Sequence, residues 1–139
     1  MAKTRAETGK SQLEIALCPA PQAAELGRAF IRRRLIGLGY GDLIDDACQI
    51  ASEMISNAVT VLTTGEHVMQ GSIRLRLNPN QGRLLVELWD SSPEMPVLKE
   101  MDPFSESGRG LHIIRSLAER FGWYADEERG GKTTWALLT

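Results

Sequence analysis

The spacing of apolar residues changes abruptly near Gly71, and this change limits the folds that the chain can adopt. Between positions 43 and 61, apolar residues recur every three or four positions, which indicates an amphipathic helix. Its stripe consists of Leu43, Ala47, Ile50, Ala51, Met54, Ile55, Ala58 and Val61. From Ile73 onward the period becomes two, which indicates strands. A chain that carries both patterns buries a helix stripe against a sheet face, which predicts an α/β fold.

The segment before this helix predicts a strand and one further helix. Apolar residues alternate with polar or small ones between Leu13 and Leu17, as in a half-buried strand. Pro21 suits the start of a helix that runs to the turn region Gly37–Gly41. Asp42 suits the N-cap of the long helix, which is expected to end before Gly65.

The segment after Gly71 predicts two hairpins separated by a long loop and a helix. In order, these are strands Ile73–Leu77 and Arg83–Trp89 about a turn at 78–82, a loop from Ser91 to Ser107, a helix from Gly108 to Gly122, and strands at 123–128 and 132–138. The turn is rich in Asn, Pro and Gly, and the loop has three prolines and no period. The order predicts a two-layer α/β sandwich whose mixed, mostly antiparallel sheet is covered on one face by helices.

Length and charge narrow the class of protein. The 139 residues fit one domain, with residues 1–11 expected as a disordered lead-in and residues 12–139 as the folded part. A formal net charge of −2 argues against a nucleic-acid binder. No run approaches the roughly 20 apolar residues of a membrane span, and no signal peptide is evident, so a cytoplasmic location is expected. Cys18 and Cys48 are expected to be buried, reduced thiols.

Glu53 and Asn57 interrupt the apolar stripe of the long helix at its edge. They are four residues apart, so their side chains lie on one face, one turn from each other. A carboxylate can act as a general base, and an amide oxygen is a neutral, hard ligand for Mg²⁺. Taken alone, the pair is explained as well by an exposed Glu and Asn on an amphipathic helix.

Two later segments add an acid and a glycine-rich helix start. Asp90 directly follows an apolar strand, where it could accept a hydrogen bond from an amine or simply close the strand with an Asx-turn. The segment Ser107–Leu111 opens the next helix with two glycines. Glycine lets a ligand approach the backbone, and a helix start favours an anion such as phosphate, although the segment could also be a hinge.

The segment Gly130–Ala136 contains Gly-Lys-Thr but is not a P-loop. The upstream position that requires glycine is Asp126, and a strand is expected where a P-loop needs a helix. A tight hairpin turn accounts for the two glycines, and Thr133 and Thr134 are ordinary strand residues unless one of them faces a site.

In this order, the segments resemble the N, G1 and G2 boxes of GHKL (Bergerat-fold) ATP-binding domains, followed by the closing hairpin of that fold. The resemblance covers the chain from about Leu13 to its end. It is closest to the stand-alone anti-sigma-factor serine/threonine kinases, whose motifs are similar to Ser52–Val59, Gly108–Leu111 and Gly131–Ala136. Many GHKL proteins carry Asp-x-Gly-x-Gly at the second box, whereas Ser92 and Glu94 stand in place of both glycines here.

The resemblance implies that the chain binds ATP with Mg²⁺. Asn57 would coordinate the metal ion, and Glu53 would accept the proton of an attacking serine hydroxyl. Asp90 would bind the adenine amine, with Thr133 supporting it directly or through water. The residues that would surround the phosphates are Gly108, Arg109, Gly110 and Leu111, and residues 92–107 would form the lid.

The resemblance also implies a function, a serine/threonine protein kinase that acts as an anti-sigma factor. Its partners would be a sigma factor and a STAS-type anti-anti-sigma protein that it phosphorylates, and it could form a homodimer, without direct contact with nucleic acid or membrane. The alternative is a non-catalytic, ATP-sensing partner-switch module, which the missing glycines favour. An ATPase of the gyrase or chaperone kind is disfavoured, because those enzymes use a transducer domain.

Overall fold

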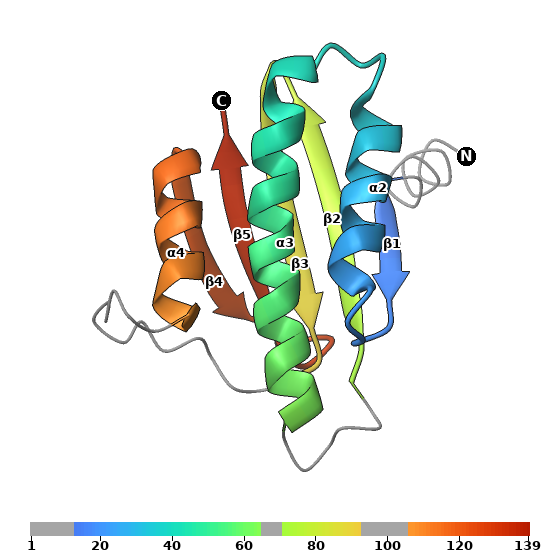
Figure 1. The fold of residues 1–139 in the computed structure, drawn as a ribbon, viewed down its shortest axis with the longest axis vertical. Coiled ribbons are helices and arrows are strands. Elements are labelled where there is room, and N and C mark those ends of the chain that lie inside the picture. Colours follow the sequence, from blue (N-terminus) through green and yellow to red (C-terminus); the bar gives the residue numbers. More distant parts are fainter. Residues whose placement is uncertain (1–12, 65–70, 93–105) are drawn as a thin grey trace.

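Three helices lie side by side over one face of a five-stranded sheet in the computed structural model of the chain (Figure 1). The structure describes residues 13–64, 71–92 and 106–139, so the expected lead-in at 1–11 lies outside the described residues. The elements are β1 (Glu14–Leu17), α2 (Ala23–Leu35), α3 (Gly41–Thr64), β2 (Ile73–Asn80), β3 (Arg83–Asp90), α4 (Glu106–Leu117), β4 (Arg120–Ala125) and β5 (Lys132–Leu138). The predicted α/β sandwich with helices on one face is confirmed.

The sheet has the strand order β1-β2-β3-β5-β4. All four pairings among the described residues are antiparallel, so the parallel component of the expected mixed sheet is not found among them. β3 and β5 lie next to each other and run in opposite directions, which brings the end of β3 beside the start of β5. This pairing places Asp90 directly opposite Lys132.

The core forms where the helix stripes meet the inward row of each strand. Alternate residues are buried from Ile73 to Leu77 in β2 and from Leu84 to Asp90 in β3, and these residues are Ile73, Leu75, Leu77, Leu84, Val86, Leu88 and Asp90. On the helices, Ile31, Leu35, Ile50 and Ile55 are completely buried above them. Complete burial of such an aliphatic side chain contributes roughly 1.5–3 kcal/mol. Gly27 lets α2 approach α3 closely, since a Cβ atom there would lie 2.5 Å from Cδ1 of Ile55.

The hairpin between β2 and β3 is tighter than the sequence predicts. The strands continue through Asn78 and Pro79, and only Gln81 and Gly82 form the turn, with φ values of 53° and 80°. Positive φ at both central residues matches the right-handed twist of the flanking strands. Pro79 fits because Leu77, two residues earlier, donates its backbone N–H to Leu13 on the β1 side. The missing N–H of Pro79 therefore points away from β3.

The predicted helix from Gly108 to Gly122 is wrong at both ends. The helix begins two residues earlier, at Glu106, and it ends at Leu117. Phe121 and Gly122 lie in β4 instead, opposite Ala136 and Trp135. Phe121 continues the helical spacing but also begins a period-two pattern, and pairing with β5 decides in favour of the strand.

Two smaller predictions are also wrong. Asp42 is not the N-cap of the long helix, because α3 begins at Gly41 and Asp42 lies in its first turn. There the carboxylate still meets the positive end of the helix dipole. Cys18 is exposed, whereas Cys48 is buried as expected. Cys18 follows the buried Leu17 at the end of β1, so its side chain points away from the core.

Candidate functional site

The predicted site residues gather at one end of the sandwich, the lower end in Figure 1. β3 ends there in Asp90, β5 begins there at Lys132, and α4 begins at the same end. α3 runs in the opposite direction to α4, so the half of α3 that carries Glu53 and Asn57 is the half nearer this end. The fold thus brings together segments that lie far apart in the sequence.

Glu53 and Asn57 lie on the flank of α3 that faces away from α2. The opposite flank contacts α2, where Arg28 donates from Nη1 to Oγ of Ser52 at 2.9 Å and the Sγ of Cys48 donates to the Arg28 carbonyl. One step along a helix turns the side chain by about 100°, so Glu53 faces away from that contact, and Asn57 follows one turn later. Since α2 and α4 lie on opposite sides of α3, both residues lie on the α4 side, half-buried (Figure 1).

Asp90 is deeply buried, with 2% of its surface exposed. Its Oδ1 accepts a hydrogen bond from Nζ of Lys132 at 2.9 Å and another from the backbone N–H of Ser92 at 2.9 Å. Burial raises the pKa of the Asp90 carboxyl above its ordinary value, and the hydrogen bond and charge of Lys132 counteract this rise. The result is a carboxylate held in place at the end of an apolar strand.

The sequence analysis gave Lys132 no role of its own, because it considered this residue only within a rejected P-loop and within the motif Gly131–Ala136. The signal is its place in the strand, because Lys132 lies in the row of β5 that continues through Thr134, Ala136 and Leu138 on the core side. A lysine in an inward row requires an acid, and Asp90 is the acid in the inward row of β3. Gly131 permits their approach, since it has φ +71° and a Cβ atom there would lie 2.0 Å from the carbonyl oxygen of Asp90.

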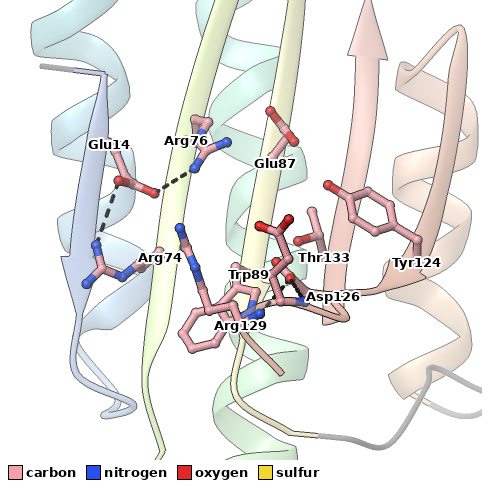
Figure 2. Close-up of a pocket in the computed structure, with 10 residues that line it drawn as sticks. Glu14, Arg74, Arg76, Glu87, Trp89, Tyr124, Asp126, Arg129 and Thr133 are labelled. Atoms are coloured by element: carbon pink, nitrogen blue, oxygen red, sulfur yellow. Dashed lines mark hydrogen bonds and ion pairs between the residues drawn. The ribbon is translucent and has the colours of Figure 1, made fainter. Parts of the chain in front are cut away.

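The structure does not bring Thr133 together with the Asp90 side chain. Thr133 is paired with Trp89, and successive strand residues point to opposite faces, so both lie on the face of the sheet without helices. Figure 2 shows Thr133 in a pocket on that face beside Trp89 and Tyr124. Thr134, one residue later, lies on the helix-covered face.

The glycine-rich segment lies inside α4 rather than before it. Because α4 begins at Glu106, Gly108 and Arg109 belong to its first turn, where backbone N–H groups have no partner within the helix. The N–H groups of Gly110 and Leu111 are already within reach of the carbonyls four residues earlier. An anion at this helix start would meet backbone N–H groups of the first turn, which includes Gly108, so the role of Gly108, Arg109, Gly110 and Leu111 in phosphate binding stays a prediction.

The expected lid falls almost wholly on residues 93–105, which lie outside the described residues, as does Glu94. Ser92, which stands where many relatives in the resembled family carry glycine, is described and buried. The backbone N–H of Ser92 donates a hydrogen bond to the Asp90 carboxylate. The substitution of this glycine therefore leaves the hydrogen bond to Asp90 in place.

The pocket that contains Thr133 on the helix-free face of the sheet is polar and has a volume of about 220 Å³ (Figure 2). On one side, Glu14 forms ion pairs with Arg74 at 3.7 Å and with Arg76 at 3.2 Å. On the other side, the guanidinium of Arg129 lies 5.5 Å from the ring centre of Trp89, whose Nε1 donates to the carbonyl of Gly130. The two contacts of Trp89 hold the turn between β4 and β5 against the sheet.

Within the described ranges, no group of three or more His, Cys, Asp and Glu side chains is arranged to hold a metal ion. Among those same residues, no helix has both the length and the apolar character needed to cross a bilayer.

Comparison with known proteins gives one finding on the family. The family described as the histidine kinase-like ATPase domain matches residues 19–137, which include Glu53, Asn57, Asp90 and the whole of α4. A comparison with curated proteins returns no match.

Proposed function

The chain belongs to the histidine kinase-like ATPase family, and we propose that it binds ATP and phosphorylates a serine or threonine of a partner protein. The family supports ATP binding, and the kinase activity is the further step. One observation carries that step, the position of Glu53 and Asn57 on the flank of α3 that faces away from α2, in the half of α3 nearer the end where β3 terminates in Asp90. The proposed base Glu53 and the proposed Mg²⁺ ligand Asn57 then lie toward the same end of the sandwich as Asp90, the proposed acceptor for the adenine amine.

The residues at this end fit ATP with Mg²⁺ by their chemistry. Asp90 supplies a buried acceptor for an exocyclic amine, and Asn57 supplies an amide oxygen, which suits Mg²⁺. The first turn of α4 offers backbone N–H groups and a positive dipole to phosphate oxygens. When bound, Mg²⁺ neutralises negative charge on the phosphates during transfer.

Glu53 is proposed as the general base. It would take the proton from the hydroxyl of a partner serine while that oxygen bonds to the γ-phosphorus of ATP. The bond between the γ-phosphorus and the oxygen of the β-phosphate breaks, and ADP leaves. Positioning and charge neutralisation are most of what phosphoryl transfer requires, so one half-buried carboxylate that accepts this proton is sufficient.

The proposed partners are a STAS-type anti-anti-sigma protein as substrate and a sigma factor as the protein that is sequestered. The similarity of Ser52–Val59, Gly108–Leu111 and Gly131–Ala136 to the anti-sigma-factor kinases supports this choice. A homodimer and a cytoplasmic location belong to the same proposal. In this role the chain would act on transcription through protein contacts, without binding nucleic acid itself.

The test measures transfer of radiolabelled γ-phosphate from ATP to STAS-type proteins encoded in the same genome. We expect Glu53→Gln to reduce transfer by about 100-fold or more while the affinity for ATP changes by less than about twofold. Glu25→Gln is the matched control, because Glu25 is an exposed acid in the first turn of α2. Transfer that is unchanged in Glu53→Gln, or absent with every such partner, contradicts the kinase activity.

The second candidate function is an ATP-sensing module that sequesters its partner without phosphorylating it. The buried Ser92, in place of a glycine of the second box, favours this reading, because it leaves less backbone freedom beside the site. Calorimetric titration with ATP and Mg²⁺ separates the two. Binding that is lost in Asp90→Asn, without transfer to any partner, favours the module, and binding with transfer favours the kinase.

A further inference from the structure

The proposed kinase mechanism gives no role to the ion pair between Lys132 and Asp90. The two side chains are 6% and 3% exposed, and Nζ lies 2.9 Å from Oδ1. The backbone N–H of Ser92 donates to the same oxygen. Two donors on one oxygen fix the orientation of the carboxylate, and the register of β3 and β5 places the lysine directly opposite the acid.

A buried acid and a buried lysine each depend on the other for their charge. Removing one partner of such a pair leaves an uncompensated charge, which the remaining group relieves by changing its protonation state. On β2 and β3, the residues beside Asp90 are the apolar Ile73 and two serines, Ser72 and Ser91. Among the described residues, Lys132 is the cation that forms an ion pair with this carboxylate, and its charge favours the ionised form.

We propose that Lys132 is the positioning residue through which Asp90 selects a 6-amino purine over a 6-oxo purine. The inference rests on the proposed function, in which Asp90 binds the adenine amine. An ionised carboxylate has only acceptors, so it accepts a hydrogen bond from the amine of adenine and repels the oxygen of a 6-oxo purine. A protonated carboxyl both donates and accepts, and it pairs with either base.

The test compares ATP with inosine triphosphate, which carries an oxygen in place of the amine. Titration calorimetry with Mg²⁺ measures both affinities for the wild type, Lys132→Met and Lys132→Arg. We expect the wild type to prefer ATP by about tenfold or more, as for a hydrogen bond to a charged group. In Lys132→Met we expect the affinity for ATP to fall by about tenfold. We expect the affinity for inosine triphosphate to rise by about fivefold, because a protonated Asp90 donates a hydrogen bond to the oxygen that the ionised carboxylate repels. Lys132→Arg, which keeps the charge, should restore the preference.

Each other outcome overturns the inference in a recognisable way. Equal losses for both nucleotides in Lys132→Met mean that Lys132 serves only the structure. A gain in affinity for ATP means that the lysine competes with the ligand for Asp90. A wild type that is folded but binds neither nucleotide removes the proposed function as well, whereas binding that Asp90→Asn abolishes and Lys132→Met leaves unchanged removes this inference alone.

The proposal can also be tested where Lys132→Met does not fold. Lys132→Gln keeps a donor but no charge, and we expect it to lose the preference for ATP in the same way. In the wild type, the carboxyl carbon of Asp90 should show the NMR shift of an ionised group at neutral pH. A protonated Asp90 in the wild type contradicts the proposal without any substitution.

Discussion

β3 carries two acids with raised pKa values on opposite faces of the sheet, and among the described residues only one of them forms an ion pair. Asp90 lies on the helix-covered face and Glu87 on the other, and burial is the main cause of the raised pKa in both. Asp90 has a lysine at 2.9 Å. Glu87 faces Arg76 across the strands, but Arg76 forms its ion pair with Glu14, and no cation among the described residues lies within ion-pair distance of Glu87.

The difference shows that burial alone does not mark a functional acid. Glu87 lies in mid-strand beside partly buried neighbours, and its pKa is raised because burial on the sheet face removes water from the carboxylate. Asp90 lies at a strand end, next to a glycine that admits the approach of β5 and opposite a dedicated cation. Burying a charged pair at the edge of an apolar core costs desolvation free energy. Groups that are buried at this cost are often found in ligand sites.

The largest predicted effect tests the glycine that brings Lys132 to Asp90. Gly131→Ala places a Cβ atom 2.0 Å from the carbonyl oxygen of Asp90, at a backbone φ of +71°. We expect a loss of about 3 kcal/mol or more in the free energy of unfolding, measured by urea denaturation, since both overpacking and backbone strain contribute.

Gly130→Ala is the matched control for this experiment. Gly130 has a similar φ of +78°, but a Cβ atom there would have nothing within 4 Å. Only the cost of the left-handed conformation remains, about 1–2 kcal/mol. Equal losses for the two variants would contradict the close approach of the two strands at Asp90.

A smaller effect distinguishes the two faces of β5. Thr134 lies in the row of Lys132 on the helix-covered face, and Thr133 lies in the pocket of the other face. We expect Thr134→Ala to weaken ATP binding by about fivefold, the value of one neutral hydrogen bond, and Thr133→Ala to change it by less than about twofold. Titration calorimetry measures both. The reverse order would restore the role that the sequence analysis gave to Thr133.

Thr133 also shows which part of the site could be predicted from the sequence. The helices, the strands and the order of the motifs follow from periodicity, because a stripe on α3 and alternation on β2 and β3 are local patterns. The choice between Thr133 and Thr134 depends on the register of β5 against β3, which shifts every side chain to the other face when it moves by one residue. Register is set by partners distant in the sequence, so the motif alone could not decide it.

The same reasoning explains Lys132 and the ends of α4. A lysine after two glycines resembles turn chemistry, and its pairing with an acid 42 residues earlier becomes visible only in the sheet. For α4, Phe121 fits both helical spacing and the alternation of β4, and the hydrogen bonds to β5 decide between them. Predictions on the lid at 92–107 stay predictions, since residues 93–105 lie outside the described part of the chain.

The smallest predicted effect concerns Glu87, the acid without an ion pair. Because its pKa is raised in the folded state, the native protein binds more protons than the unfolded chain between the ordinary glutamate pKa and the raised value. Stability therefore falls as pH rises through this window, and the full penalty is present above it. We expect Glu87→Gln to be more stable than the wild type by about 0.5 kcal/mol at pH 8. The difference in the free energy of unfolding should shrink as the pH is lowered toward the ordinary pKa of glutamate.

Urea denaturation across this pH range checks the prediction, with Glu127→Gln as the control, because Glu127 is an exposed acid of the turn between β4 and β5. The control should follow the wild-type profile, since an exposed carboxylate loses little hydration on folding. A Glu87→Gln profile that runs parallel to that of the wild type would mean that Arg76 compensates Glu87 fully despite its ion pair with Glu14. The two faces of β3 would then differ only in the distance from the acid to its cation, and the ion pair with Lys132 would no longer distinguish Asp90 from Glu87.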